Sequence, residues 1–284
     1  MKRQIAIQGI KGCFHDAAAH EYFAARFPGD EIEIIECDTF EQMFELLDSD
    51  PQVTGIVAIE NTIAGALLQN HELLRRSSLQ IVGEHKMRIA HVLCALPGTA
   101  IEDVFEVNSH PMALMQCEQF LHSHQSMKKS ETFDTAGSAR MIAANHLKGH
   151  AAICGEYAAG LYGLDILQSG IETNKRNFTR FLIVADPLNV AELRPAESQL
   201  NKASIVFTLP HVQGALSKVL TVLSFYDMNL SKIQSMPIIG REWEYRFYVD
   251  LTFESYARYL KAIDAVRPLM SDFKSLGEYS ATPD

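Results

Sequence analysis

The sequence lacks the features that mark membrane, exported or metal-binding proteins. It contains no run of about 18 or more apolar residues, and its first residues, Met1–Ile7, enter a strand-like pattern without the apolar stretch of a signal peptide. The cysteines are widely scattered with no C-x-x-C pair, so the sequence predicts neither a disulfide framework nor a zinc site. We therefore expect a cytoplasmic protein that needs no metal and no other cofactor.

Positive charge is also scarce. The 25 Lys and Arg residues are outnumbered by 35 Asp and Glu residues, which gives a formal net charge of −10. A protein that follows a phosphate backbone needs an excess of basic side chains, so a nucleic-acid partner is not expected. At 284 residues and 47% hydrophobic, the chain has the size and composition of one large or two ordinary globular domains.

Glycine motifs for nucleotide binding are missing as well. Gly9 and Gly12 follow a predicted strand at residues 4–8 but give only G-x-x-G, without the third glycine of a dinucleotide-binding turn or the Lys-Ser/Thr pair of a P-loop. The turn could still hold an anion, because free backbone N–H groups and the helix dipole favour negative charge at a helix start. The helix that follows is expected to bury one face, made of Phe14, Ala17, Ala18, Tyr22 and Ala25.

Polar residues follow the next buried strand. Predicted strands at Ile32–Glu36 and Gly55–Ile59 enclose an amphipathic helix, and this β-α-β order predicts a parallel sheet. The second strand runs into Glu60, Asn61 and Thr62 at its carboxyl end, where ligands bind in open α/β sheets. The same asparagine and threonine could instead cap the next helix. The residues alone leave both interpretations open.

Later strand ends repeat this scheme. A predicted strand at Val104–Val107 leads to Ser109, a good N-cap, with Pro111 in the first helical turn. Gln116 lies two helical turns after Ser109, which puts its amide near the same side as the cap. Thr135 follows another strand end, at the start of a further helix. Each of these strand ends offers a hydroxyl, an amide or a free N–H to a ligand.

The strand predicted at Asn177–Val184 is central to the interpretation. Its alternation points Thr179 and Arg180 to opposite faces. It could be an ordinary edge strand whose arginine is solvated. Alternatively, residues 79–96 resemble strands that cross into a second lobe, and Asn177–Val184 returns to the first. In that arrangement the polar strand ends would surround one cleft.

The last part of the chain has a different organisation. Residues 186–201 contain prolines and mixed charge and predict a linker. After them the pattern predicts the order βαββαβ, the ferredoxin-like plan. The predicted elements are strands at 204–209, 229–233, 243–253 and 273–277 and helices at 215–225 and 256–266. A four-stranded sheet with helices on one face leaves an edge or a face free for pairing with another subunit.

Four ordered motifs make the chain resemble bacterial prephenate dehydratase over essentially its whole length. They are the Gly9–Gly12 turn, Ala58-Ile59-Glu60-Asn61 in place of the family's Pro-Ile-Glu-Asn, the Ser109–Cys117 run, and Thr179-Arg180-Phe181. The C-terminal part resembles an ACT domain through Gly214-Ala215-Leu216 and Asn229–Ile233. The fold class implied is an α/β, two-lobed, periplasmic-binding-protein-like catalytic domain followed by an α+β ferredoxin-like ACT domain.

The resemblance implies domain boundaries. The catalytic domain would be 1–185, with lobe one at about 1–80 and 165–185 and lobe two at about 81–164. A linker at 186–201 and a regulatory domain at 202–284 would follow.

The resemblance also implies a reaction and its residues. Prephenate would lose CO₂ and water to give phenylpyruvate, with the Thr179 hydroxyl donating to the departing hydroxyl. Asn61, Ser109 and Gln116 would supply neutral hydrogen bonds. The expected substrate-binding residues are Gly12, Glu60, Thr135, Arg180 and Phe181. Arg180 could instead pair with a neighbouring acid.

The same resemblance implies regulation by phenylalanine in a homodimer or homotetramer. The expected effector site comprises Gly214, Ala215, Leu216, Asn229, Leu230 and Ser231. Gln234 and Met236 depart from the family's motif and suggest weaker sensitivity. Ile10, Cys13 and His15 depart from its first loop, and Asp134 stands where many members have Ser. Arogenate dehydratase and a non-catalytic amino-acid sensor remain as alternatives.

Overall fold

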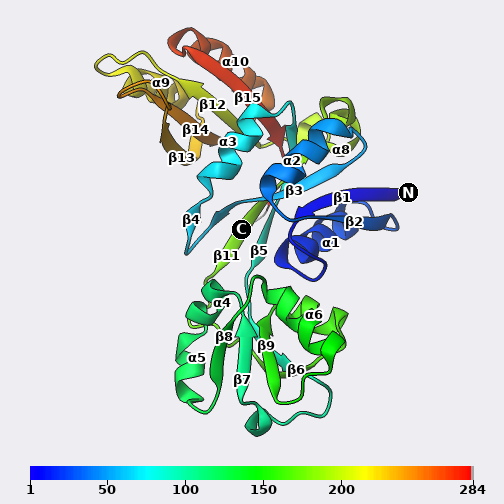
Figure 1. The fold of residues 1–284 in the computed structure, drawn as a ribbon. Helices are drawn as coiled ribbons and strands as arrows, with labels where there is room; N and C mark the ends of the chain where they lie inside the picture. Colours follow the sequence, from blue (N-terminus) through cyan, green and yellow to red (C-terminus); the bar gives the residue numbers. More distant parts are fainter. Residues whose placement is uncertain (283–284) are drawn as a thin grey trace. The chain divides into compact units, whose positions relative to one another are not determined.

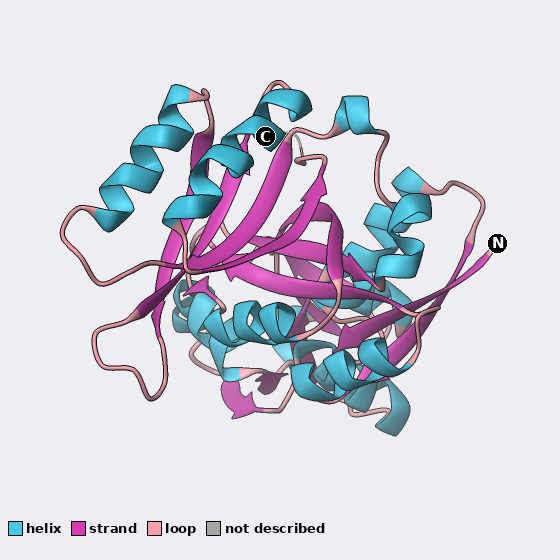
Figure 2. Ribbon diagram, turned by 90° about the horizontal axis from the view of Figure 1, so that it is seen from above, coloured by secondary structure: helices cyan, strands magenta, loops and turns pink. Residues whose placement is uncertain are grey.

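The computed structural model describes residues 1–282 and contains three β-sheets with helices packed on them (Figure 1). The chain forms two compact units made of discontinuous segments. The first unit comprises 1–43, 56–66 and 86–181, and the second comprises 44–55, 67–85 and 182–284. In Figure 2 the helices, in cyan, flank the magenta sheets. The boundaries at 185 and 201 stay predictions.

The first sheet has six strands in the order β2-β1-β3-β11-β5, with the short β4 paired to β3. β1 and β2 are parallel, as the β-α-β order predicted. The edge-strand interpretation of β11 is wrong, because β3 and β5 flank it on either side. The elements here are β1 (Lys2–Gln8), α1 (Phe14–Arg26), β2 (Glu31–Cys37), α2 (Phe40–Ser49), β3 (Thr54–Asn61), β4 (Gly65–Ala66), α3 (Leu68–Arg76), β5 (Gln80–Arg88) and β11 (Phe178–Ala185).

The central strands are mostly apolar on both faces, with polar residues at their ends. Residues 54–59 of β3 and 179–185 of β11 are all buried, which is typical of interior strands covered by helices on both sides. Helix α1 buries Asp16, Ala19 and Phe23 together with two predicted alanines, whereas Ala25 is exposed. The predicted helical face was therefore displaced around the helix.

The second sheet has the order β10-β6-β9-β7-β8. β7 is parallel to β8 and β9, and β6 is antiparallel to β9 and β10. Its elements are β6 (Val92–Ala95), β7 (Glu106–Ser109), α4 (Pro111–Gln116), α5 (Glu118–Ser123), β8 (Lys128–Glu131), α6 (Thr135–Asn145), β9 (His150–Cys154), α7 (Glu156–Leu161) and β10 (Asp165–Ser169).

Two details of the second sheet correct the sequence analysis. β7 lies two residues later than the strand predicted at 104–107. β10 was not predicted, and it pairs with β6, so residues 165–169 belong to the second sheet rather than to lobe one. The chain enters this sheet between β5 and β6 and leaves it between β10 and β11, in agreement with the crossing predicted at 79–96 and the return predicted at 177–184. The first-sheet strands at these crossings, β5 and β11, are labelled in Figure 1.

The C-terminal sheet is antiparallel with the order β13-β14-β12-β15, and the predicted βαββαβ topology is confirmed. α9 and α10 pack together on a core that includes Phe207 and Leu251. The elements are β12 (Lys202–Thr208), α9 (Ala215–Phe225), β13 (Asn229–Pro237), β14 (Tyr245–Thr252), α10 (Tyr256–Val266) and β15 (Asp272–Tyr279). The predicted linker is not featureless, since 187–189, 190–193 and 197–199 form short helices.

Charged groups join β5 and α3 to the C-terminal sheet within the second unit. The Lys202 ammonium lies 2.9 and 3.1 Å from the two oxygens of Glu84, and both side chains are buried. Thr282 donates its backbone N–H to the same carboxylate at 3.0 Å. A Cβ on Gly277, whose φ is +148°, would lie 2.3 Å from the Ile81 carbonyl oxygen, so only glycine fits this approach.

A second charged cluster surrounds Glu72 on α3. Its carboxylate accepts from Arg75 at 2.7 and 2.9 Å, from Arg246 at 3.2 Å and from the Tyr248 hydroxyl at 2.8 Å. These bonds hold the pKa of Glu72 at about 2, although its burial acts in the opposite direction.

Across residues 1–282, every helix falls short of the length and apolar character needed to cross a membrane.

Candidate active site

Asn61 ends β3 and folds its side chain over the turn that follows. Its Oδ1 accepts from the backbone N–H groups of Ile63 and Ala64, both at 2.9 Å. This turn, formed by an asparagine over its own backbone, fixes the direction of the amide. The capping interpretation of Asn61 and Thr62 is wrong, because α3 begins at Leu68, beyond β4.

Thr62 ties the same turn to the start of β11. Its backbone N–H donates to the Phe178 carbonyl at 2.9 Å, and its hydroxyl donates to the Arg176 carbonyl at 3.0 Å. The hydroxyl also accepts from the Phe178 N–H at 2.9 Å. The end of β3 and the beginning of β11 are therefore held together by backbone and side chain alike.

A chain of uncharged hydrogen bonds runs through this junction. Asn61 Nδ2 lies 3.0 Å from Thr179 Oγ1 and 2.7 Å from Asn177 Oδ1. Asn177 Nδ2 lies 3.3 Å from Gln116 Oε1, which also lies 2.9 Å from His91 Nε2. We call these five residues the neutral network. Three of the four predicted catalytic residues, Thr179, Asn61 and Gln116, thus come together.

Sequence reasoning missed the other two members. Asn177 directly precedes Phe-Thr-Arg-Phe and its polarity could have drawn attention, whereas His91 lies in a mixed extended stretch with no local motif. Both are buried, at 1% and 2% exposure. Burial lowers the pKa of His91, while the Gln116 contact and the Glu172 charge act in the opposite direction. The imidazole is therefore neutral at neutral pH.

Glu172 supports the backbone beside His91. Its carboxylate accepts from the His91 N–H at 3.0 Å and from Arg88 at 2.7 Å, and Lys175 lies 3.5 Å away. Burial alone would raise the pKa of Glu172, but the backbone donors and the two cations hold it below its usual range. Between Glu172 and Thr179, the chain of hydrogen bonds runs through His91 and the uncharged amides of Gln116, Asn177 and Asn61.

Ser109 does not join the neutral network. It ends β7 rather than capping a helix, and its fully buried hydroxyl donates to the Ile153 carbonyl at 2.6 Å. The actual N-cap of α4 is His110, whose Nδ1 accepts from the Met112 N–H at 3.2 Å. The predicted N-cap is therefore wrong, and the Ser109 hydroxyl is used within the second sheet.

Arg180 and Phe181 are both buried and contact neighbouring side chains. Arg180 is 9% exposed and its guanidinium lies 3.9 Å from Glu60, which favours the alternative in which it pairs with an acid. Phe181 is 1% exposed and meets the His15 ring edge to face at 5.1 Å between centroids. Their expected contact with substrate stays a prediction.

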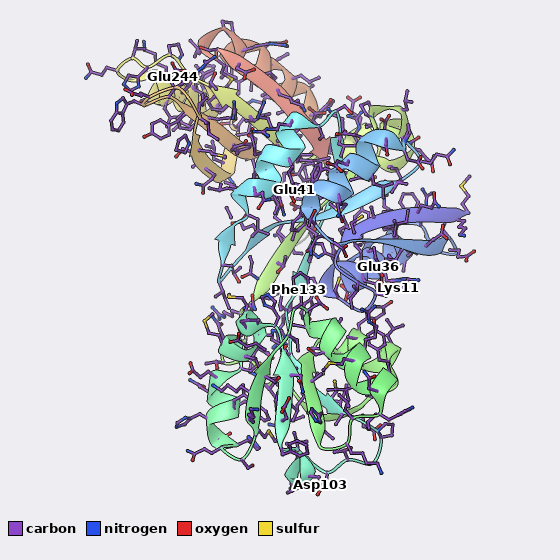
Figure 3. All side chains as sticks on the ribbon, viewed as in Figure 1. Lys11, Glu36, Glu41, Asp103, Phe133 and Glu244 are labelled. Atoms are coloured by element: carbon purple, nitrogen blue, oxygen red, sulfur yellow. The ribbon has the colours of Figure 1, made fainter. Side chains whose placement is uncertain are left out.

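Backbone N–H groups of the Gly9–Gly12 turn donate to carboxylates from neighbouring elements, Asp16 of α1 and Glu36 of β2. The Gly12 N–H donates to Asp16 at 2.7 Å, and the Lys11 N–H donates to Glu36 at 2.6 Å; Lys11 and Glu36 are labelled in Figure 3. Burial raises the pKa of Asp16, and the Gly12 N–H and nearby His20 oppose that rise. The expected anion site at Gly12 is thus occupied by Asp16, an outcome that the sequence analysis did not foresee.

Close packing explains why Gly12 is a glycine. Its φ is +90°, and a Cβ there would lie 3.1 Å from Tyr162 and 3.4 Å from Ala136. Both neighbours come from the second sheet's helical layer, and the Tyr162 hydroxyl donates to the Lys11 carbonyl at 2.5 Å. The turn therefore packs against the start of α6 and the end of α7.

The start of α6, expected to hold a carboxylate at Thr135, already carries one. Asp134 is the N-cap, and its Oδ1 accepts from the Gly137 N–H at 2.7 Å. A negative charge at this helix start opposes binding of a second one. The neighbouring Phe133, labelled in Figure 3, is 89% exposed.

His15 and Cys13, which differ from the family's residues in the first loop, pack against neighbouring residues. His15 Nε2 accepts from the Ala58 N–H at 3.3 Å, and burial lowers the pKa of His15 to about 4. Burial raises the pKa of the Cys13 thiol to about 12, so the thiolate is strongly disfavoured. Both residues are therefore neutral packing groups at neutral pH.

A cavity of about 610 Å³ adjoins the neutral network, a size suited to a small molecule. Gln116 and Asn177 supply part of its wall. The lining residues are Ile63, Met115, Gln116, Glu118, Gln119, His122, Thr173, Asn174 and Asn177.

Comparison with known proteins agrees with this geometry. The family model for prephenate dehydratase matches residues 5–188. Arogenate dehydratase/prephenate dehydratase 2 from Arabidopsis thaliana is 35% identical over 87% of this chain and 64% of its own length. The bifunctional chorismate mutase/prephenate dehydratase of Escherichia coli K12 is 33% identical over 97% of this chain and 70% of its own. The chain spans about two thirds of the length of these relatives.

Solved structures share the fold over nearly the whole chain. A prephenate dehydratase from Arthrobacter aurescens in complex with L-Phe superposes with a TM-score of 0.83 at 26% identity, covering 98% of this chain and 89% of that one. GqqA, described as a novel type of quorum quenching acylase, has a TM-score of 0.83 at 30% identity, covering 99% of both chains.

The family match and the relatives identify an α/β enzyme of the hydro-lyase class. Within that class, the chain belongs to the prephenate dehydratase family.

Proposed function

We propose that this protein converts prephenate to phenylpyruvate, CO₂ and water in L-phenylalanine biosynthesis. The observation that carries the proposal is the direction of the Asn61–Thr179 hydrogen bond. Asn61 donates to Thr179 Oγ1, so the threonine's own hydrogen is left for another acceptor. That acceptor would be the departing hydroxyl of the substrate.

The chemistry suits a neutral donor. As the ring carboxylate leaves as CO₂, its bonding electrons enter the ring, the C4 hydroxyl departs with the electrons of its own bond, and the ring becomes aromatic. The departing hydroxide takes up one proton, supplied in the end by solvent, to become water. A threonine hydroxyl is a very weak acid, so its contribution is a hydrogen bond that strengthens as negative charge grows on the leaving oxygen. One such positioned donor is typically worth about 10²–10³ in kcat.

The other predicted site residues differ in how closely their contacts connect them to Thr179 and to the cavity. Asn61 and Gln116 belong to the network that positions Thr179, and Gln116 also lines the cavity. We propose that both contact or orient the substrate. Ser109 would act through the packing of β7 on β9, because its hydroxyl is engaged there. Gly12, Glu60, Thr135, Arg180 and Phe181 stay predictions as substrate-binding residues.

Arogenate is the alternative substrate, since several relatives are named arogenate dehydratases. It carries an amine where prephenate has a keto group. A non-catalytic sensor is less well supported, because the Thr179 donor and its network are intact. Assays of the purified protein on both substrates would separate these possibilities. Failure to convert either one would contradict the dehydratase assignment.

An acylase activity, as in the description of one structural neighbour, has weaker support from the site. Acyl transfer needs an activated nucleophile next to a base. Cys13 is buried with its pKa raised to about 12, and His15 Nε2 is engaged by the Ala58 N–H. The dehydratase proposal needs neither residue.

We further propose that the C-terminal sheet is an ACT domain that binds phenylalanine and inhibits the enzyme. Gly214 has a φ of +75°, and a Cβ there would meet no heavy atom within 4 Å, so a ligand could approach its backbone. β13, which carries Asn229, Leu230 and Ser231, is an edge strand that a second subunit could pair with. Ala215 and Leu216 line a small cavity with residues 209–212, whereas Asn229 lines a separate one.

Phenylalanine binding gives the test of this regulation. Calorimetry on the intact chain should show phenylalanine binding, and the rate of phenylpyruvate formation should fall as phenylalanine is added. Because Gln234 and Met236 replace the family's side chains, the affinity should be weak but measurable. A protein that turns over prephenate and binds no phenylalanine would contradict the regulatory proposal while leaving the catalytic one standing. The bacterial type and the cytoplasmic location remain part of the proposal.

A further inference from the structure

The direction of each hydrogen bond in the neutral network follows from one fixed amide. Asn61 Oδ1 accepts two backbone N–H groups, which can only donate. Asn61 Nδ2 must therefore be the donor toward Asn177 Oδ1 and Thr179 Oγ1. The turn after β3 thus determines which atom of Asn61 faces β11.

The same logic passes along the chain. Since Asn177 Oδ1 accepts from Asn61, Asn177 presents its Nδ2 to Gln116 Oε1. Because Gln116 Oε1 accepts from Asn177, His91 must carry its hydrogen on Nε2 to donate to the same oxygen. This leaves His91 Nδ1 unprotonated, and it is a buried atom without a hydrogen-bond partner among residues 1–282.

Apart from the buried His91 Nδ1, the amide oxygens and the threonine oxygen of this network accept from within it, and two donors are left over. Within residues 1–282, neither the Thr179 hydroxyl hydrogen nor the Gln116 Nε2 group donates to another protein atom. Both remain available to a ligand. The network therefore offers hydrogen bonds to acceptors, such as a departing hydroxyl, a carboxylate or a keto oxygen.

We propose that Asn177 is a positioning residue that sets the direction of both donors. This proposal rests on the proposed function, because the direction of the two donors affects activity only if they hydrogen-bond to a substrate. Asn177 is the one residue that accepts from Asn61 on the Thr179 side and donates to Gln116 on the other. It is 1% exposed, and both its amide oxygen and its amide nitrogen are engaged by neighbouring side chains, so it acts through those neighbours.

The first experiment replaces Asn177 by an apolar side chain of similar size. Asn177→Leu removes both bonds, so Asn61 Nδ2 can turn fully to the Phe178 carbonyl, 3.2 Å away, and release Thr179. We expect kcat to fall by about 10- to 100-fold, as misplacement of reacting groups typically does, with KM changed by less than about threefold. The matched control is Asn108→Leu, the same change at another buried asparagine, in β7. Its kcat should stay near that of the wild type.

The second experiment asks whether the loss passes through Thr179. In a double-mutant cycle, Asn177→Leu should cost less than about threefold in kcat when Thr179→Ala is already present, since the hydroxyl to be oriented is gone. If the two losses multiply, Asn177 has an independent or merely structural role and the proposal is wrong. Thermal unfolding of each variant reports on the fold.

Asn177→Asp provides a test if the leucine variant does not fold. Aspartate keeps an acceptor for Asn61 but cannot donate to Gln116, and it adds negative charge beside an anionic substrate. KM should therefore rise while kcat stays within about tenfold of the wild type. A kcat loss equal to that of Thr179→Ala with normal KM would contradict the proposal. If the wild type forms no phenylpyruvate at all, the proposed function itself fails, which is a separate outcome.

Discussion

Two hydrogen-bond networks in this molecule are built from opposite kinds of groups. The neutral network of the first unit consists of two amide asparagines, a glutamine, a threonine and an uncharged histidine. The second unit joins α3 and β5 to the C-terminal sheet with ionised groups, Glu72 among arginines and Glu84 with Lys202. Hydrogen bonds between neutral groups fix the orientation of the donors without adding net charge. Hydrogen bonds in ion pairs are stronger, but their contribution depends on pH and on the presence of both charged partners.

The difference has a chemical reason. A site for a departing hydroxyl needs donors whose direction is fixed, so that their hydrogen bonds strengthen as negative charge grows on the leaving oxygen. The ion pairs that join α3 and β5 to the C-terminal sheet do not need donors of fixed direction. If one partner of such a pair is removed, however, the other is left as a buried, unpaired charge. The following predictions test this contrast, from the largest expected effect to the smallest.

Lys202→Met should be the most damaging change in the second unit. It leaves the Glu84 carboxylate buried without its cation, and breaking one side of a buried pair typically costs about 3–5 kcal/mol. Chemical denaturation should show this loss in the free energy of unfolding. The double variant Lys202→Met with Glu84→Gln should recover most of it. Equal stability of the single and double variants would show that the ion pair does not contribute in this way.

Thr179→Ala should remove most turnover and little stability. We expect kcat to fall by about 10²–10³, because one positioned donor is lost. Thr179→Ser keeps the hydroxyl and should retain part of the rate. The measurement is phenylpyruvate formation by folded, purified variants. Near-normal kcat in Thr179→Ala would remove this residue from the centre of the site.

Glu72→Gln should weaken the fold in a pH-dependent manner. The folded-state pKa of Glu72, about 2, lies below its ordinary value of 4.5. The ionised carboxylate therefore stabilises the fold above pH 4.5, and that stability is lost as the pH falls toward about 2. At pH 7 the variant should be less stable by about 2–3 kcal/mol. Unfolding curves of both proteins should converge at low pH, and a constant difference would contradict this origin.

Gln116→Ala should have the smallest of these effects. It removes one available donor and the acceptor for His91 but leaves the Asn61–Thr179 bond in place. We expect kcat/KM to fall by about tenfold, since a hydrogen bond between neutral groups contributes about 1 kcal/mol and stranding a buried partner adds to that. Steady-state kinetics would measure it. Unchanged kcat and KM would exclude Gln116 from the site.

Much of the fold followed from local patterns. The helices predicted at 215–225 and 256–266 match α9 and α10 to the residue, because their apolar faces repeat with helical period. β10 was missed because its side chains are mostly exposed, which gives no clear apolar pattern. An edge strand of this kind is held by pairing with β6, which is a tertiary contact.

The site was predictable only where chemistry lies within a motif. Thr179, Asn61 and Gln116 were predicted because each lies in one of the motifs that resemble the family, and the structure brings these three side chains into one network. His91 could not be found, since its role depends on Gln116, 25 residues away along the chain. At Gly12 the partner of the backbone N–H was missed for a different reason. Asp16, one turn into the same helix, is buried and occupies the Gly12 N–H that a ligand was expected to meet.

The pairing of Glu84 has a consequence for how the chain is made. Lys202 follows Glu84 by 118 residues and Thr282 follows it by 198. At typical synthesis rates of about 5–20 residues per second, β5 leaves the ribosome roughly 6–24 s before its cation exists, and at least about 10 s before its last donor. During that interval the Glu84 carboxylate must stay hydrated, so β5 cannot take its final burial until the C-terminal sheet is finished. A ribosome-stalled chain ending before residue 202 should therefore leave β5 open to proteolysis.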